Sequence, residues 1–199
     1  MRTFKVVNSA LVMLMLASSA MGDESRKLKG DFAYTGSAVC ANSGANFATN
    51  PPTPPLGFAN FLPIGPSFAS SNSVQGTMTF NGDGTGSMVQ QFVSLGNGGA
   101  ASVQDTTNDF TYSVADDGAL TIDIGPSFST TVAGSGAGGQ SIITNVPTFI
   151  GRLSSDGKSL TFATSTAAVE TVTRVVPAPE VVTALRICNR TRTGIRIKD

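Results

Sequence analysis

The sequence predicts an all-β fold, a single antiparallel β-barrel of roughly 8–10 strands. Apolar and polar residues alternate with period two in several segments, and turns containing Asp and Gly recur between these segments. Helical periodicity is absent after the first 22 residues. The chain has 199 residues, which is enough for one domain with a core and too few for two ordinary ones. We therefore expect one β-barrel domain over residues 23–199.

The first 22 residues have the pattern of a secretory signal peptide. Arg2 and Lys5 precede an apolar run over residues 6–17, which is too short to span a membrane and is followed by small residues. Cleavage is expected after Ala20 or Gly22. No later segment approaches the roughly 18 consecutive apolar residues of a membrane helix. We predict a secreted or periplasmic protein without an integral membrane span.

Alternating residues predict three hairpins and four further strands. In each hairpin two strands flank a turn that contains Asp and Gly, residues that tolerate the backbone conformations of tight turns. The paired segments are residues 73–80 with 85–95, 110–114 with 120–124, and 149–153 with 160–162. The further strands are expected at residues 31–39, 140–145, 169–175 and 184–197.

The two cysteines are placed near the two ends of the exported chain. In an oxidising compartment Cys40 and Cys188 are expected to form a disulfide, the alternative being two free buried thiols. Such a bridge makes the first and last strands neighbours. Since a closed sheet has no exposed edges, this favours a barrel over an open sandwich.

A Pro/Phe-rich insertion follows the first strand, at residues 50–72. It contains six of the ten prolines, which oppose central strand pairing. The favoured interpretation is a loop whose Phe side chains pack against the barrel exterior or plug its end; the alternatives are an apolar flap that helps enclose a hydrophobic ligand and a surface that docks a partner. The pentapeptide of residues 64–68, Ile-Gly-Pro-Ser-Phe, recurs at residues 124–128 and is interpreted as reused turn chemistry.

A run of arginines near the C-terminus has even spacing, so its members share one face of a strand. The favoured interpretation is a solvated face that protects a sheet edge, and the alternative is binding of an anionic headgroup or a surface polysaccharide. Glu170 is expected to form an ion pair with Arg174 or Arg186. The members of the run are Arg186, Arg190, Arg192 and Arg196.

Composition excludes several classes of function. The 13 Lys and Arg balance the 13 Asp and Glu, and only 13 % of residues are charged, so nucleic acid is not an expected partner. The absence of histidine excludes Ser-His-Asp and Cys-His catalysis and His-ligated zinc. No pair of carboxylates can be placed at a catalytic separation. We expect no cofactor and no metal, and the composition favours a binding protein over an enzyme.

One family resemblance follows from the ends of the predicted barrel. The opening Gly30-Asp31-Phe32, the meander of hairpins and the Arg-bearing last strand resemble the calycin superfamily of lipocalin-like barrels. In that superfamily a Gly-x-Trp motif on the first strand packs under an Arg near the last. The resemblance implies that Phe32 holds the aromatic position, although this chain has no Trp, and that Arg186 or Arg190 supplies the cation.

These observations predict an exported lipocalin-like barrel that binds a small hydrophobic ligand non-covalently. One alternative is a non-catalytic structural or interaction module of the cell surface with a packed barrel. A second is a cyclase-type barrel enzyme that acts by shape. The sequence does not decide the oligomeric state. The predicted ligand-binding residues are Phe58, Phe61, Leu62, Phe68, Phe92 and Tyr112.

Overall fold

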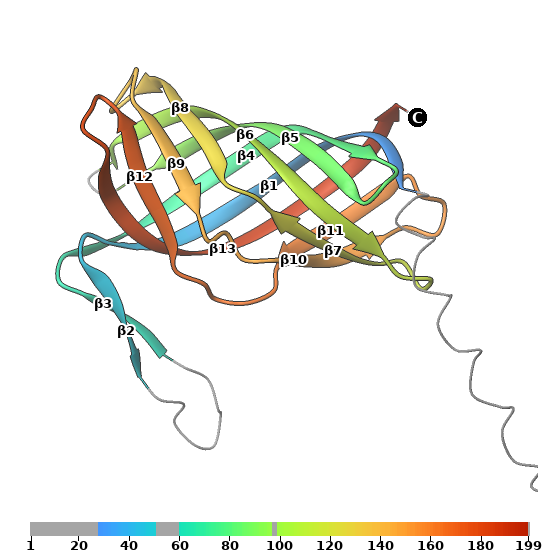
Figure 1. Ribbon diagram of the computed structural model, residues 1–199, viewed down its shortest axis with the longest axis horizontal. Coiled ribbons are helices and arrows are strands. Elements are labelled where there is room, and N and C mark those ends of the chain that lie inside the picture. The colour runs from blue at the N-terminus through green and yellow to red at the C-terminus, as the bar shows by residue number, and fades with distance from the viewer. Residues whose placement is uncertain (1–27, 51–59, 97–98, 199) are drawn as a thin grey trace, which may run out of the picture.

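The computed structural model describes residues 28–50, 60–96 and 99–198, so the predicted signal peptide at residues 1–22 lies outside the described residues. The described chain is almost entirely antiparallel strand, which confirms the all-β class (Figure 1). Within these ranges no helix has the length and apolar character needed to cross a membrane. The strands are β1 (Lys29–Ser43), β2 (Asn46–Asn50), β3 (Asn60–Ile64), β4 (Ser67–Asn81), β5 (Thr85–Leu95), β6 (Ala101–Val114), β7 (Ala119–Ile124), β8 (Ser127–Gly134), β9 (Gln140–Thr144), β10 (Phe149–Leu153), β11 (Ser159–Thr164), β12 (Glu170–Val176) and β13 (Val181–Lys198).

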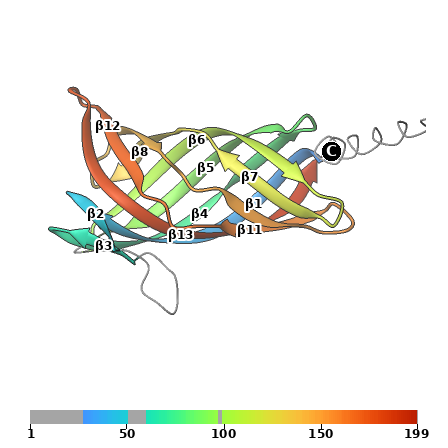
Figure 2. The ribbon, with the colours of Figure 1, turned by 60° about the horizontal axis from the view of Figure 1, so that its bottom comes forward.

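Eleven of these strands form one sheet whose pairings run in a ring, because β1 pairs with β4 on one side and with β13 on the other. Five long strands, β1, β4, β5, β6 and β13, make up part of this ring-like sheet. The rest consists of short strands placed end to end. One half of β6 pairs with β7 and the other half with β8, while β13 divides in the same way between β11 and β12. Figure 2 shows the elongated shape that results.

The predicted disulfide closes the ring. Cys40 and Cys188 lie directly opposite each other in the β1–β13 register, are bonded, and are both buried. The pairing around them extends from Asp31 to Ser43 on β1. The first and last long strands are therefore joined covalently as well as by backbone hydrogen bonds.

The repeated pentapeptide interrupts strands and does not reverse the chain. Residues 64–68 separate β3 from β4, and residues 124–128 separate β7 from β8. At residues 64–68 the chain keeps its direction from β3 into β4, because β2 and β3 continue the β1–β4 register. Ser43 lies opposite Ser67, and Asn46 lies opposite Ile64. Proline has no N–H to extend the ladder. The interpretation as turn chemistry was therefore wrong: the motif breaks a strand at a fixed point.

The Pro/Phe-rich insertion contains more strand than predicted. β3 pairs with β2 in a two-stranded sheet, where Pro63 lies opposite Phe47, and β4 begins within the insertion at Ser67. A two-stranded ribbon has two free edges, and proline is tolerated on an edge. The hairpin projects from the ring-like sheet at the end opposite the C-terminus (Figures 1 and 2). Residues 51–59 lie outside the described residues.

The interior changes from apolar to polar along the length of the ring-like sheet. The end that holds Phe32, near the start of β1, is filled by a packed apolar cluster with edge-to-face aromatic pairs. Farther along, polar residues face inward, and β8 reverses the usual pattern: Ser127 and Ser129 are buried while Phe128 is 57 % exposed. No strand was predicted over β8 because its inner face is polar. The other buried polar residues in this region include Gln90, Thr106 and Asn108.

Removing the disulfide is expected to lower the stability of the fold. Cys40 and Cys188 are 148 residues apart, and the entropy of closing such a loop in the unfolded chain corresponds to at most about 5 kcal/mol. Guanidinium unfolding of the C40A/C188A variant should give a free energy of unfolding lower by a large part of this amount. Circular dichroism would check that the variant keeps its strand content. An unchanged unfolding midpoint would contradict the expectation.

Candidate functional site

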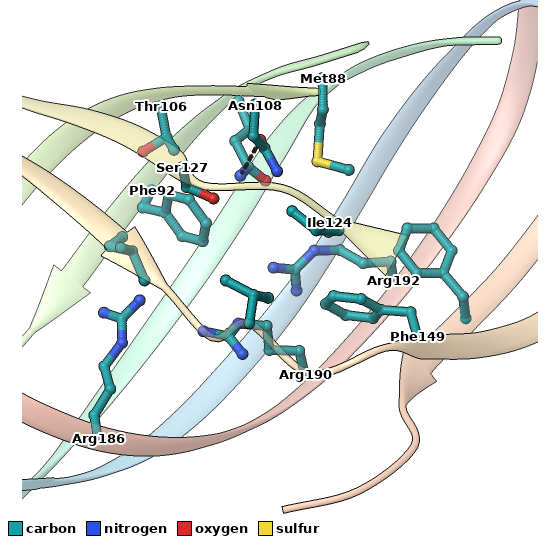
Figure 3. A pocket seen from close by; sticks show the side chains of 14 residues that line it. Met88, Phe92, Thr106, Asn108, Ile124, Ser127, Phe149, Arg186, Arg190 and Arg192 are labelled. Atoms are coloured by element: carbon teal, nitrogen blue, oxygen red, sulfur yellow. Dashed lines mark hydrogen bonds between the residues drawn. The ribbon is translucent and has the colours of Figure 1, made fainter. Parts of the chain in front are cut away.

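A hollow lies inside the ring-like sheet, where the apolar cluster meets the polar region (Figure 3). Its empty volume is about 400 Å³, including the part that opens to solvent. Side chains reach it from β5, β6 and β13 and from both sides of the interruptions between β7 and β8 and between β9 and β10. The lining residues are Met88, Gln90, Phe92, Thr106, Asn108, Ile124, Ser127, Ile143, Val146, Phe149, Phe162, Arg186, Arg190 and Arg192.

Three arginines of the C-terminal run line this hollow, contrary to the favoured interpretation of a solvated face at a sheet edge. Arg190 and Arg192 are only 6 % and 4 % exposed. The reason is closure: β13 has a neighbour on each side and is not an edge. Alternation along the strand then turns Arg186, Arg190 and Arg192 toward the interior.

Glu170 lies buried between two of these arginines. Arg186 Nε donates to Glu170 Oε2 at 2.8 Å, which confirms the predicted ion pair with Arg186 and not with Arg174. Arg190 Nη2 donates to the same oxygen at 2.6 Å, and its Nη1 donates to Oε1, so the second pair is bidentate. The sequence did not predict this second partner.

The arginines keep Glu170 ionised. Burial by itself raises the pKa of the Glu170 carboxyl, but the charge of Arg186 and the hydrogen bonds and charge of Arg190 outweigh it. The pKa of Glu170 therefore lies below its ordinary value. One carboxylate here balances one of two guanidinium charges.

Arg192 has no carboxylate partner among the described residues. Its Nη1 donates to the backbone oxygens of Ser37 and Thr191, both at 3.0 Å. Its guanidinium carbon lies 5.9 Å from the centre of the Phe92 ring. Gly36 faces Arg192 in the β1–β13 register, and a Cβ on this glycine would come within 2.8 Å of Arg192 Cδ. The small residue makes room for the large one.

Arg192 stays charged despite its burial. Burial lowers the pKa of the Arg192 guanidinium to about 10; Tyr34 opposes this shift and the charge of Arg190 adds to it. A pKa of about 10 leaves the group cationic at neutral pH. Among the described residues that line the hollow, three carry guanidinium groups and none carries a carboxylate.

A chain of buried polar side chains ends at the same hollow. The Tyr34 hydroxyl donates to Gln90 Oε1 at 2.6 Å, and Gln90 Nε2 donates to Asn108 Oδ1 at 3.4 Å. Burial raises the pKa of Tyr34, against the effect of Arg192, so the hydroxyl keeps its proton and remains the first donor. Asn108 Nδ2 is buried and has no acceptor within residues 28–50, 60–96 and 99–198.

The predicted ligand-binding residues do not gather at one place. Phe92 lines the hollow. Tyr112 belongs to the packed apolar cluster, where its hydroxyl donates to the Leu28 backbone oxygen at 2.5 Å. Phe68 is 40 % exposed on β4. Phe61 and Leu62 belong to β3, and Phe58 lies outside the described residues. Ligand binding by this set stays a prediction.

The aromatic residue of the opening motif packs against a different arginine from the two expected. Arg196 lies over the Phe32 ring, with its guanidinium carbon 5.1 Å from the ring centre. Neither Arg186 nor Arg190 takes this place, because the β1–β13 register sets Phe32 opposite Arg196. The cation was therefore assigned to the wrong residues.

Comparison with protein families, curated proteins and solved structures finds no match for this chain. The strand pairings establish the antiparallel ring-like sheet without any such match. The resemblance to calycins stays a prediction.

Replacing Glu170 should destabilise the protein and change how its stability depends on pH. Glu170→Gln leaves two largely buried guanidinium groups without a countercharge, which costs about 3–5 kcal/mol in comparable buried pairs. Because the folded-state pKa of Glu170 is lowered, its contribution is present above the unfolded pKa and is lost as pH falls through the folded value.

Urea unfolding between about pH 6 and about pH 3 would measure this contribution. We expect the native protein to lose more stability over this interval than Glu170→Gln does. Asp117→Asn is the control, since Asp117 and its partner Arg152 are both well exposed, and it should change stability much less. Equal stability of Glu170→Gln and the native protein at the upper pH would refute the assignment.

Proposed function

We propose that this is an exported protein that binds a small, largely apolar molecule non-covalently inside its ring-like sheet. The observation that carries the proposal is the hollow, in which apolar side chains supply half of the lining. A concave site of this kind, apolar with a few converging polar groups, is the usual setting for a small ligand. The apolar lining residues are Met88, Phe92, Ile124, Ile143, Val146, Phe149 and Phe162.

The size of the hollow limits the ligand. The empty volume of about 400 Å³ includes solvent-open space, so the enclosed part of the hollow is smaller than this value. The packed apolar cluster on one side leaves no room for a long chain to extend in that direction. A small, compact molecule therefore suits the hollow better than an extended lipid.

Export is supported by the disulfide. A buried bridge between Cys40 and Cys188 persists in oxidising compartments and is rare in the cytosol. Together with the signal-peptide pattern, this favours a secreted or periplasmic location. A carrier in such a compartment needs neither a cofactor nor a catalytic group, which agrees with the composition of the chain.

Filling the hollow should abolish binding of an apolar probe. The probe is N-phenyl-1-naphthylamine, an uncharged molecule whose fluorescence rises when it leaves water. Val146→Trp places a large side chain in the lining and should raise the dissociation constant at least about tenfold. Val132→Trp, at an exposed position on β8, is the matched control and should bind as the native protein does. Equal binding by both variants, or no binding by the native protein, would sink the proposal.

A further inference from the structure

The hollow carries an excess of positive charge that the described protein does not balance. Arg186 and Arg190 share the carboxylate of Glu170, and within the described residues the hydrogen bonds of Arg192 go to backbone oxygens, with the Phe92 ring beside its guanidinium. A buried guanidinium without a countercharge is costly, because neutral acceptors replace only part of its hydration. Such a group is the usual partner for a carboxylate or another planar oxyanion.

A second observation, independent of charge, points to the same place. Asn108 is 5 % exposed, lines the hollow, and keeps an Nδ2 donor without an acceptor. The orientation of its amide follows from the donor chain that begins at Tyr34: Gln90 uses its oxygen for Tyr34 and its amino group for Asn108 Oδ1. An unpaired buried N–H costs free energy that an incoming acceptor would recover.

These groups reach the hollow from different strands. Arg192 extends from β13 and Asn108 from β6, and both are seen among the lining side chains in Figure 3. Phe92, Phe149 and Phe162 supply apolar surface in the same space. The lining therefore combines a cation and a neutral donor with an aromatic wall.

We propose that the ligand is a small organic acid whose oxyanion, a carboxylate or sulfonate, binds the Arg192 guanidinium and the Asn108 amide while its apolar body packs against the phenylalanines. The inference rests on the proposed function and specifies its ligand class. Arg186 and Arg190 hold Glu170 and add a positive field without direct contact. A neutral ligand of the same shape leaves the Arg192 charge without a countercharge and the Asn108 amide without an acceptor, and binds more weakly through this subsite.

Two related probes separate the oxyanion subsite from the apolar hollow. The anionic probe is 8-anilinonaphthalene-1-sulfonate, and the neutral probe is N-phenyl-1-naphthylamine, which has the same aromatic body without the sulfonate. Both are titrated by fluorescence at constant ionic strength against the native protein and three variants. Arg192→Met and Asn108→Asp alter the subsite; Arg152→Met removes one cation from an exposed position and is the control for net charge.

The expected result is selective loss of the anion. Arg192→Met should raise the dissociation constant of the sulfonate about tenfold or more, the loss expected for one charge-assisted hydrogen bond, and change that of the neutral probe less than about twofold. Asn108→Asp should act in the same direction, since a carboxylate would then face the sulfonate. Arg152→Met should leave both constants unchanged.

Binding of the neutral probe also reports that each variant is folded. If Arg192→Met does not fold, Asn108→Asp decides the matter by the same comparison. Equal effects of a folded variant on both probes, or an equal loss of sulfonate binding in Arg152→Met, would overturn the oxyanion subsite while the proposed function stands. Failure of the native protein to bind the neutral probe would instead overturn the proposed function.

Discussion

The pairing of β1 with β13 is the constraint on which the rest of the structure depends. It gives the first and last long strands a partner on each side, and the disulfide between Cys40 and Cys188 secures it. On an open sheet the arginines of β13 could point into water at little cost. In the ring-like sheet the same alternation turns Arg190 and Arg192 inward. There a buried charge is costly unless it is paired or hydrogen-bonded. Closure thus produces both the hollow and its charge.

Stability and polarity are concentrated in different parts of the interior. The cluster around Phe32 and Phe80 buries aromatic rings in edge-to-face contact, and the Arg196 guanidinium lies over the Phe32 ring. The region beyond it holds Glu170 and the arginines. The attraction between Glu170 and its arginine partners offsets only part of the free-energy cost of removing these charges from water. Packing at one end and the disulfide therefore stabilise a fold that carries destabilising charges in its middle. This division is common where a binding site has to be polar and buried.

Most of the strands could be predicted from the sequence, but not which face of each strand points inward. Residues 73–80 lie within β4, where the apolar side chains Met78 and Phe80 face the core, but in β5 Val89 and Val93 are exposed while Gln90 is buried. β8 was missed because its inner residues are serines and its outer residue Phe128 is apolar. Even spacing showed that the arginines share a face, yet only the closure of the sheet decides that this face is internal. Asn108 gave no signal, because a buried amide and an exposed one look alike in a sequence.

The hairpin of β2 and β3 continues the β1–β4 register beyond the ring-like sheet. The length of this hairpin is therefore independent of the ring-like sheet. Residues added in equal number to β2 and β3 would lengthen the hairpin without changing the β1–β4 register. An insertion on one arm alone would shift the β2–β3 register unless a bulge absorbed it, and Gly65, with a positive φ of 77°, is a position where the backbone can depart from regular strand. The β2–β3 hairpin thus tolerates variation in length. In the ring-like sheet, by contrast, a register shift of one residue would exchange inner and outer side chains.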